Sequence, residues 1–302
     1  MKIFKQAARQ FSSAALMLLL AIQTNAESSV LADDETSKLL QQVIDNRTDE
    51  AKARDKWRNP YETLQFFGMQ PDHFVVEMMP GEGQWYTDII APYVAEKGRL
   101  AAVAYQLPMY FAFLINPDAA RAERIITWKD RFPPQATEKY NLAQPATSLE
   151  FGKIPDEING QVDMVVMIRE LHNYWRVRGE NNYAEEALQD TFNMLKPGGV
   201  VGVVQHRAPE DAEGMAGDGS FGYMKQSEVI RLFEDAGFIF EASTELNANP
   251  KDNPETEQLS EGVFPVVWRL PPFSIYGEKD KEIFEAVGES DRMTLRFRKP
   301  EK

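Results

Sequence analysis

From residue 71 onward, short apolar runs alternate with helical stretches along the sequence. The clearest run, residues 162–168 (VDMVVMI), is apolar and β-branched over most of its length and is too short for a buried helix. Runs of this kind predict strands of a parallel sheet whose two faces are both covered by helices. Strands are predicted at residues 74–78, 99–105, 146–151, 162–168, 200–205, 238–246 and 292–298.

Helical periodicity fills the segments between these strands. The Asn59-Pro60 pair breaks a first helical region, and Gly68 and Gly237 each stand where glycine commonly ends a helix. Helices are predicted at residues 37–57 (one or two), 62–67, 86–96, 108–129, 182–195 and 226–236. Residues 247–287 form a polar insertion before the last strand, and the pattern predicts no order for it.

The first 26 residues have the composition of a secretory signal peptide. Positive side chains precede the nine apolar residues 14–22 (AALMLLLAI), and small residues at Thr24 and Ala26 offer a cleavage site after Ala26. Nine residues are too few to cross a bilayer, which requires about 20 in a helix. We therefore expect a cleaved signal, a periplasmic or secreted protein without a membrane anchor, and a polar leader that begins at residue 27.

The chain is acidic and lacks cysteine. It carries 33 Lys and Arg against 47 Asp and Glu, a formal net charge of −14. A surface of this sign repels phosphate backbones and anionic headgroups, so nucleic acid and membrane surfaces are disfavoured as partners. The lack of cysteine excludes disulfides, thiolate metal ligands and a cysteine nucleophile. A small-molecule partner is therefore expected, and the sequence does not indicate an oligomeric state.

The most informative segment is residues 75–85 (VVEMMPGEGQW), where an acidic strand residue precedes a turn that contains glycine and opens a helix. Glycines such as Gly81 and Gly83 let backbone N–H groups approach a ligand closely, and the helix N-terminus favours a carboxylate. Glu77 can accept a hydrogen bond from an amino group. This geometry suits a nucleoside ligand. A turn with a purely structural role is the alternative.

Together with the strand order along the chain, this segment resembles class I S-adenosylmethionine (SAM) dependent methyltransferases over about residues 58–300. The family motif, acidic-x-G-x-G-x-G, holds the methionine part of SAM, and Glu77, Gly81 and Gly83 stand in it here. Pro80 and Trp85 depart from the motif and predict a tighter, bulkier turn. The resemblance implies a Rossmann-like α/β fold with SAM as cofactor. It also implies a seven-strand, mostly parallel sheet in the order 3-2-1-4-5-7-6, with helices on both faces.

A second set of residues narrows the resemblance. Residues 58–71 match the pattern R-x-P-x-E-T-L-x-F-F-G-x-x-P, and residues 195–199 (LKPGG) and 249–252 (NPKD) are further matching pieces. This set is similar to a bacterial group of exported predicted methyltransferases. The implied organisation is a signal peptide (1–26), a leader with a helical extension (27–57) and a methyltransferase-like domain (58–302).

The resemblance also indicates which residues contact the cofactor. The family places an acid for the ribose hydroxyls at the end of the second strand, where this chain has Tyr105 and Gln106. A phenol cannot replace a bidentate carboxylate, so Gln106 or a later side chain takes that role, or the ribose is held weakly. Glu150 falls near the adenine position and is alternatively a solvated loop acid. The predicted cofactor-binding set is Glu77, Pro80, Gly81, Gly83, Tyr105, Gln106, Glu150 and Arg169.

Polar residues also follow the fourth and fifth strands. Residues 169–175 (RELHNYW) and His206 come at strand ends, and the carboxyl ends of strands form the ligand crevice of open α/β sheets. The predicted catalytic set is His172 as general base, Tyr174 to orient an acceptor, and His206. The alternative is that both histidines only pack or cap.

Two other functions compete with methyl transfer to a small-molecule acceptor. An exported chain has no obvious supply of SAM, and Tyr105 replaces the ribose acid, so a non-catalytic or repurposed ligand-binding protein would keep the same fold. The third possibility is a metal-dependent enzyme, since Glu170, His172 and His206 form a two-His-one-carboxylate set. Their spacing matches no metal motif, so no metal ligands are assigned.

Overall fold

The computed structural model describes residues 35–113, 117–177, 179, 181–214, 217–220, 222–252 and 286–302. The predicted signal peptide, nearly all of the leader and most of the predicted insertion at residues 247–287 lie outside the described residues. The signal peptide, the leader and the insertion therefore stay predictions. No helix in the described part of the chain combines the length and the apolar character that a membrane span requires.

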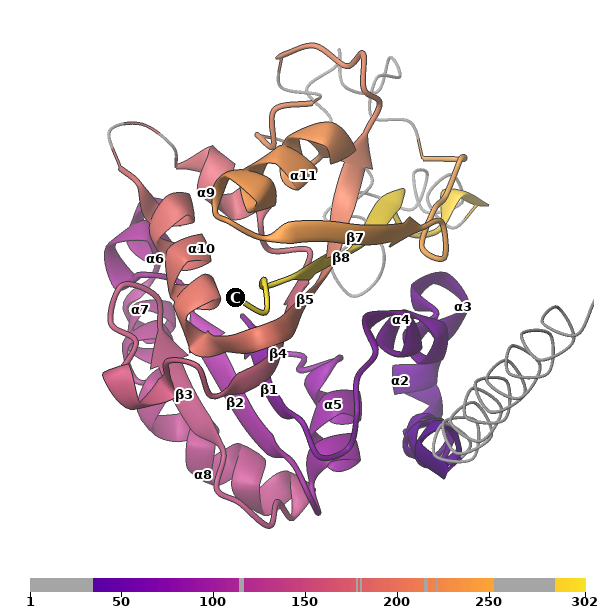
Figure 1. Ribbon diagram of the computed structural model, residues 1–302, viewed down its shortest axis with the longest axis vertical. Helices are drawn as coiled ribbons and strands as arrows, with labels where there is room; N and C mark the ends of the chain where they lie inside the picture. Colours follow the sequence, from indigo (N-terminus) through magenta and orange to yellow (C-terminus); the bar gives the residue numbers. More distant parts are fainter. Residues whose placement is uncertain are drawn as a thin grey trace, which may run out of the picture.

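A single mixed sheet forms the centre of the molecule (Figure 1). Its main path has the order β3-β2-β1-β4-β5-β8-β7. β1 to β5 pair in parallel, and β8 runs antiparallel to both of its neighbours. The strands are β1 (Phe74–Met78), β2 (Arg99–Ala104), β3 (Thr147–Glu150), β4 (Val162–Ile168), β5 (Leu195–Ala208), β6 (Met224–Lys225), β7 (Ile239–Thr244) and β8 (Arg292–Arg298). With the two-residue β6 left aside, the seven predicted strands and their order are confirmed.

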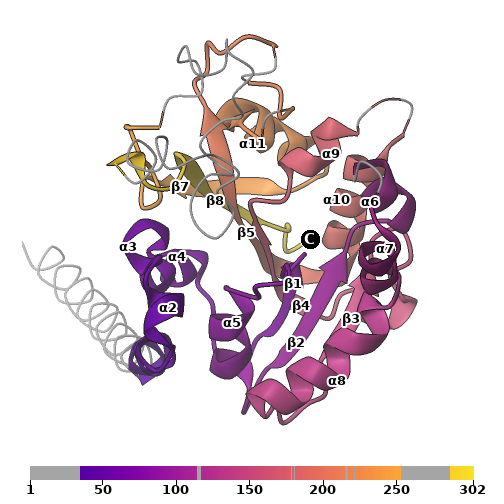
Figure 2. The same cartoon turned by 180° about the vertical axis from the view of Figure 1, so that it is seen from behind.

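Helices cover both faces of the sheet, as Figures 1 and 2 show from opposite sides. They are α2 (Asp49–Lys52), α3 (Asp55–Arg58), α4 (Pro60–Phe67), α5 (Thr87–Val94), α6 (Leu107–Phe113), α7 (Ala119–Ile126), α8 (Trp128–Tyr140), α9 (His172–Arg176), α10 (Tyr183–Met194) and α11 (Gln226–Asp235), with a 3-10 turn η1 (Asp156–Ile158). Residues 35–45 are also helical.

Two apolar cores lie on opposite faces of the sheet. Alternate strand residues divide between them, so that Val165 of β4 belongs to one core and Val166 to the other. Helices α9, α10 and α11 supply the first core, whereas α4, α5, α8 and the helix of residues 35–45 supply the second. Because successive strand side chains point to opposite faces, central strands must be apolar throughout to fill both cores. This explains the continuous apolar runs in the sequence.

The structure corrects two predicted elements. The single helix predicted at residues 108–129 is divided among α6, α7 and α8, and α8 continues to Tyr140 through Pro133 and Pro134. Burial of Phe132 and Ala136 on the sheet outweighs the backbone hydrogen bonds that the two prolines cannot make. The fifth strand begins at Leu195 instead of residue 200. Leu195 already pairs with Val162 of β4, and the pairing resumes at Val200 with Met164 after a register shift.

Gly202 of β5 lies directly beneath the Phe67 ring of α4. A Cβ at Gly202 would stand 2.4 Å from Phe67 Cδ2. Because Phe67 is fully buried, the ring has no space to move, and Gly202→Ala is expected to lower the free energy of unfolding by about 1–3 kcal/mol. Urea unfolding measures this change. Gly179→Ala is the control, since no heavy atom lies within 4 Å of its Cβ position. Equal stability of the two variants would contradict the packing described here.

Candidate functional site

The predicted site residues gather at one edge of the sheet, where the parallel strands end. Tyr105 follows β2, Met79 follows β1 and Arg169 follows β4, while His206 lies near the end of β5. Since β8 is antiparallel, its first residue, Arg292, pairs with His206 at the same edge. Carboxyl ends of strands are the usual ligand-binding edge of open α/β sheets. The edge that the sequence predicted is therefore the one on which these side chains converge.

The glycine turn between β1 and α5 is open on its outer side. No heavy atom lies within 4 Å of a Cβ built on Gly81 or Gly83, and both residues are exposed. Gly81 has a φ of +69°, a left-handed conformation that glycine adopts without strain. The predicted bulk of Trp85 does not fill the turn. Its indole Nε1 donates to the Ala51 carbonyl at 2.9 Å, which directs the ring toward the N-terminal helices.

Glu77 lies at the carboxyl end of β1 and is buried. The Thr87 hydroxyl donates a hydrogen bond to Glu77 Oε2 at 2.7 Å. Burial raises the pKa of Glu77 to about 8, although this hydrogen bond favours the ionised form. A cationic group placed beside Glu77 would favour its ionised form further, as the amino group of an amino-acid ligand does.

Tyr105 ties the end of β2 to the end of β4. Its hydroxyl lies 2.6 Å from Glu170 Oε2 and 2.8 Å from the Glu170 carbonyl oxygen, and it accepts from Asn173 Nδ2 at 2.9 Å. β1 lies between β2 and β4 in the sheet, so this bridge spans the end of β1. Burial raises the pKa of Tyr105 well above its ordinary value. The hydroxyl is thus engaged within the protein.

Gln106 and Glu150, the other predicted cofactor contacts near the ends of β2 and β3, also form hydrogen bonds or ion pairs within the protein. Gln106 Nε2 donates to the Tyr183 carbonyl at 3.0 Å, while its buried Oε1 has no partner in the described part of the chain. Glu150 is buried, which contradicts the alternative of a solvated loop acid. Burial alone would raise the pKa of Glu150, but ion pairs with Lys153 and Lys129 lower it. No carboxylate directly follows β2, so the end of this strand offers no acid for a ribose.

This arrangement fits the amino-acid end of SAM better than its ribose end. The space beside Gly81 and Gly83 leaves room for a ligand, and the buried carboxyl of Glu77 at the start of the turn suits an ammonium group. Pro80 is half-buried in the same turn. A ribose placed at the end of β2 would meet no acid there, unlike in the methyltransferases that the sequence resembles.

The two histidines predicted to be catalytic lie side by side. Their ring centroids are 5.4 Å apart, and both side chains are buried. His206 Nδ1 lies 2.6 Å from Ser290 Oγ, and His172 Nδ1 lies 3.3 Å from Gln205 Nε2. Burial lowers the pKa of His172 to about 3 and that of His206 well below its ordinary value. Both rings are therefore neutral at pH 7, and His172 is a weak base in this environment.

Tyr174 and Glu170 both contact Tyr105. Tyr174 is buried in the core beneath α9 and packs edge-on against Tyr105, with ring centroids 5.3 Å apart. Glu170, named only in the metal alternative, faces Tyr105 and Asn173. Burial raises the pKa of Glu170 to about 7, near the pH at which a general base works best. No three His, Asp or Glu side chains among the described residues form a metal-binding group.

Sequence reasoning missed a buried cluster of charged side chains at the same edge. Arg58 Nε lies 2.8 Å from Glu289 Oε1, and an Arg292 terminal nitrogen lies 2.8 Å from Glu289 Oε2. Arg54 Nε approaches Glu289 Oε1 at 3.6 Å. We call these four residues together with Arg169 the arginine cluster. The members of the cluster lie far apart in the sequence, so no local spacing could have indicated the cluster. The one sequence signal was Arg58, which belongs to the matched 58–71 pattern.

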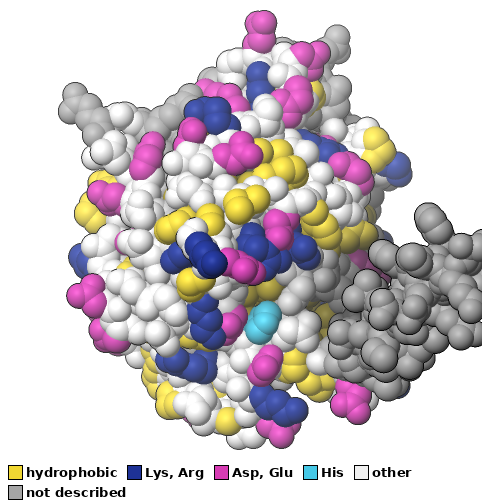
Figure 3. All heavy atoms as spheres, in the orientation of Figure 1, with side chains coloured by type: hydrophobic (Ala, Val, Ile, Leu, Met, Phe, Trp, Pro, Cys, Tyr) yellow, Lys and Arg dark blue, Asp and Glu magenta, His cyan; other side chains and the backbone are white. Residues whose placement is uncertain are grey.

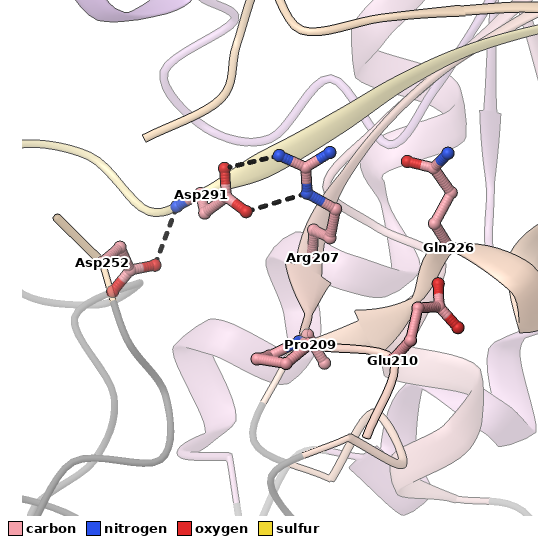
Figure 4. A pocket seen from close by; sticks show the side chains of 7 residues that line it. Arg207, Pro209, Glu210, Gln226, Asp252 and Asp291 are labelled. Carbon is pink, nitrogen blue, oxygen red and sulfur yellow. Dashed lines mark hydrogen bonds and ion pairs between the residues drawn. The ribbon is translucent and has the colours of Figure 1, made fainter. Parts of the chain in front are cut away.

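A cavity of about 320 Å³ opens beyond the end of β5 (Figure 4). Arg207 at its wall pairs with Asp291 at 2.8 Å and with Glu245 at 2.7 Å, so its charge is already balanced. The face shown in Figure 3 also carries mixed charge, with Lys and Arg side chains beside Asp and Glu side chains. The cavity is lined by Arg207, Ala208, Pro209, Glu210, Gln226, Asp252 and Asp291.

Comparison with known proteins gives structural likenesses only. No protein-family model and no curated protein matches the chain. A SAM dependent methyltransferase from Aquifex aeolicus aligns with 68% of this chain and 92% of its own, at 18% identity and a TM-score of 0.44. An arsenic(III) SAM methyltransferase from Chlamydomonas reinhardtii aligns over 87% and 73%, at 15% identity and a TM-score of 0.39. These likenesses concern the fold, which the strand order and register above establish for this chain.

Proposed function

We propose that this chain is a SAM-dependent methyltransferase that acts on a small-molecule acceptor. The observation that supports the proposal is the open glycine turn at the carboxyl edge, with buried Glu77 at its start. In this proposal Glu77, Gly81 and Gly83 hold the amino-acid end of the cofactor, and Gln106 accepts from the ribose. When bound, SAM supplies an electrophilic methyl group, and the protein positions the acceptor for in-line attack.

Proton removal from the acceptor falls to Glu170 in this proposal, in place of His172. Its pKa of about 7 keeps it half-ionised at neutral pH, whereas burial lowers the pKa of His172 to about 3. Tyr105 and Asn173 hold the Glu170 carboxylate in position through hydrogen bonds of 2.6 and 3.1 Å. His172 and His206 then shape the neutral wall of the acceptor side.

Calorimetric titration tests cofactor binding. SAM and S-adenosylhomocysteine are expected to bind the full chain with micromolar affinity, and Gly83→Trp is expected to abolish that binding. Gly83 has open space at its Cβ position and no positive φ, so a large side chain fills the ligand space without straining the backbone. Gly179→Trp is the matched control, because Gly179 also has open space and no positive φ. Lack of binding heat in the unmodified chain would contradict the proposal.

One observation favours a second candidate, a ligand-binding protein that keeps the fold without catalysis. Tyr105 stands where the family has its ribose acid, and its hydroxyl is engaged with Glu170. Export from the cytoplasm, which we propose from residues 1–26, would also separate the chain from the place where SAM is made. This candidate predicts that neither SAM nor S-adenosylhomocysteine gives heat in the same titration, while the chain remains folded.

A further inference from the structure

The arginine cluster carries more positive charge than its own carboxylate can balance. Four guanidinium groups, from Arg54, Arg58, Arg169 and Arg292, surround the single carboxylate of Glu289. Each of the four acts on the carboxylate strongly enough to lower its pKa, against the effect of burial. Buried positive charge without a matching anion is unfavourable, so a site of this kind gains stability when an anion binds.

Nearby groups do not supply the missing negative charge. His172 and His206 are neutral at pH 7 because burial lowers their pKa values. Asp291 pairs with Arg207, which lies outside the cluster. Burial raises the pKa of Glu170 to about 7, so this carboxyl is only partly ionised at neutral pH. In the described structure the guanidinium groups of Arg58, Arg169 and Arg292 therefore outnumber the carboxylate of Glu289.

Arg169 is the member with hydrogen-bond donors to spare. Its Nε is buried without a hydrogen-bond partner, and no carboxylate in the described part of the chain forms an ion pair with it. Its φ of +61° is a left-handed conformation that is uncommon for a residue with a side chain, and such conformations gather at functional sites. The backbone is thus held in an unusual conformation at a side chain that forms no close ion pair with the described residues.

The cluster lies at the carboxyl edge of the sheet, close to the glycine turn, since the Arg58 guanidinium lies 4.6 Å from the centre of the Trp85 ring. The glycine turn follows β1, on one side of β4, whereas Arg292 and His206 lie at the ends of β8 and β5, on the other side. Arg58, in α3, and Arg54, the residue before α3, both approach the Glu289 carboxylate. The N-terminal helices therefore contribute charged groups to the site as well as apolar residues to the core.

We infer that Arg169 and the arginine cluster bind an anionic group, a carboxylate or a phosphate, on the small molecule that this chain takes as its methyl acceptor. A guanidinium binds two oxygens of such a group at once, which fixes the orientation of the bound molecule. The identification of the bound molecule as the methyl acceptor rests on the proposed function. The anion site itself stands on the cluster alone.

Binding of simple anions to the full chain tests the inference. Inorganic phosphate and succinate serve as probes in calorimetric titrations, with sodium chloride added to equalise ionic strength. At least one probe is expected to bind with millimolar affinity, and Arg169→Gln is expected to weaken that binding tenfold or more. Arg169→Lys keeps the charge and loses the paired donors, so an intermediate loss is expected. Arg231→Gln is the matched control, since Arg231 is exposed on α11 and pairs with Asp235, outside the cluster.

Three results would overturn the inference. They are lack of binding by both probes, equal binding by Arg169→Gln and the unmodified chain, and loss of S-adenosylhomocysteine binding in Arg169→Gln with anion binding unchanged. The last result would assign Arg169 to the cofactor carboxylate. Failure of the proposed function is separate: if S-adenosylhomocysteine does not bind but phosphate or succinate binds through Arg169, the anion site remains and only its role in methyl transfer is lost.

Discussion

Replacing Glu289 with glutamine is expected to lower the free energy of unfolding by about 3–5 kcal/mol at pH 7. Glu289 is the only carboxylate bonded to both Arg58 and Arg292 among the described residues, and all three side chains are buried. Glutamine keeps the shape of the side chain but leaves two buried guanidinium groups without a counter-charge. Chemical denaturation of the full chain in urea measures the loss.

The effect has a defined pH dependence. Burial alone would raise the pKa of Glu289, but the charges of Arg292 and Arg58 outweigh burial and lower it to about 2. Because the folded pKa lies below the ordinary value of 4.5, the stabilisation is present above about pH 5 and is lost as the pH falls through 2. The difference between Glu289→Gln and the unmodified chain should therefore shrink between pH 5 and pH 2.

An exposed ion pair provides the control. Asp235 on α11 pairs with Arg231 at 3.0 Å, and both side chains are largely in solvent. Asp235→Asn is expected to change the free energy of unfolding by less than about 1 kcal/mol, since solvent screens such pairs. If Glu289→Gln lowered the free energy of unfolding by as little as Asp235→Asn does, the buried carboxylate would not be what holds the arginine cluster together.

Sequence reasoning could predict the sheet because each central strand must be apolar on both faces. Residues 162–168 show this directly, and Gly68 and Gly237 correctly indicated two helix ends, at φ values of +78° and +95°. The helix at residues 128–140 was missed because Pro133 and Pro134 carry a local signal to stop. Tertiary burial of Phe132 outweighs that signal, and no local pattern reports such burial.

The sequence predicted which side chains share one edge of the sheet, but not the contacts that they make there. Strand ends indicated the edge where His172 and His206 meet, because residues after parallel strands always share an edge. The bridge from Tyr105 to Glu170 joins residues 65 positions apart, and the pair of Arg58 with Glu289 joins residues 231 positions apart. Such contacts depend on how the chain returns to the sheet, which periodicity and motif spacing do not describe.

Replacing Glu77 with glutamine is expected to remove a large pH dependence of stability. Burial raises the pKa of Glu77 to about 8, whereas the unfolded chain releases this proton near 4.5. Between these pH values the unfolded state binds fewer protons, so the unmodified chain loses stability as the pH rises from about 4.5 to about 8. At about 1.4 kcal/mol for each pKa unit, the loss amounts to several kcal/mol.

Urea unfolding at a series of pH values isolates this contribution. Glu170 and Asp252 have pKa values raised by burial to about 7 and about 6, and they titrate in the same window in both proteins. The difference between Glu77→Gln and the unmodified chain therefore reports the titration of Glu77 together with its coupling to Glu170, whose charge raises the pKa of Glu77. Glutamine still accepts the hydrogen bond from Thr87, so the packing around the site is retained. Parallel pH profiles for the two proteins would mean that Glu77 is not held protonated.

The same proton links stability to cofactor binding. If the ammonium group of S-adenosylhomocysteine binds beside Glu77, the carboxyl must ionise, because an opposite charge within hydrogen-bond reach favours the charged form. Binding at pH 6.5 should then release close to one proton, since Glu77 is almost fully protonated at that pH in the free protein. Calorimetry in two buffers with different ionisation enthalpies counts the released protons. Glu77→Gln should bind S-adenosylhomocysteine more weakly and release no proton from this position. Equal proton release by the two proteins would mean that Glu77 does not contact the ligand.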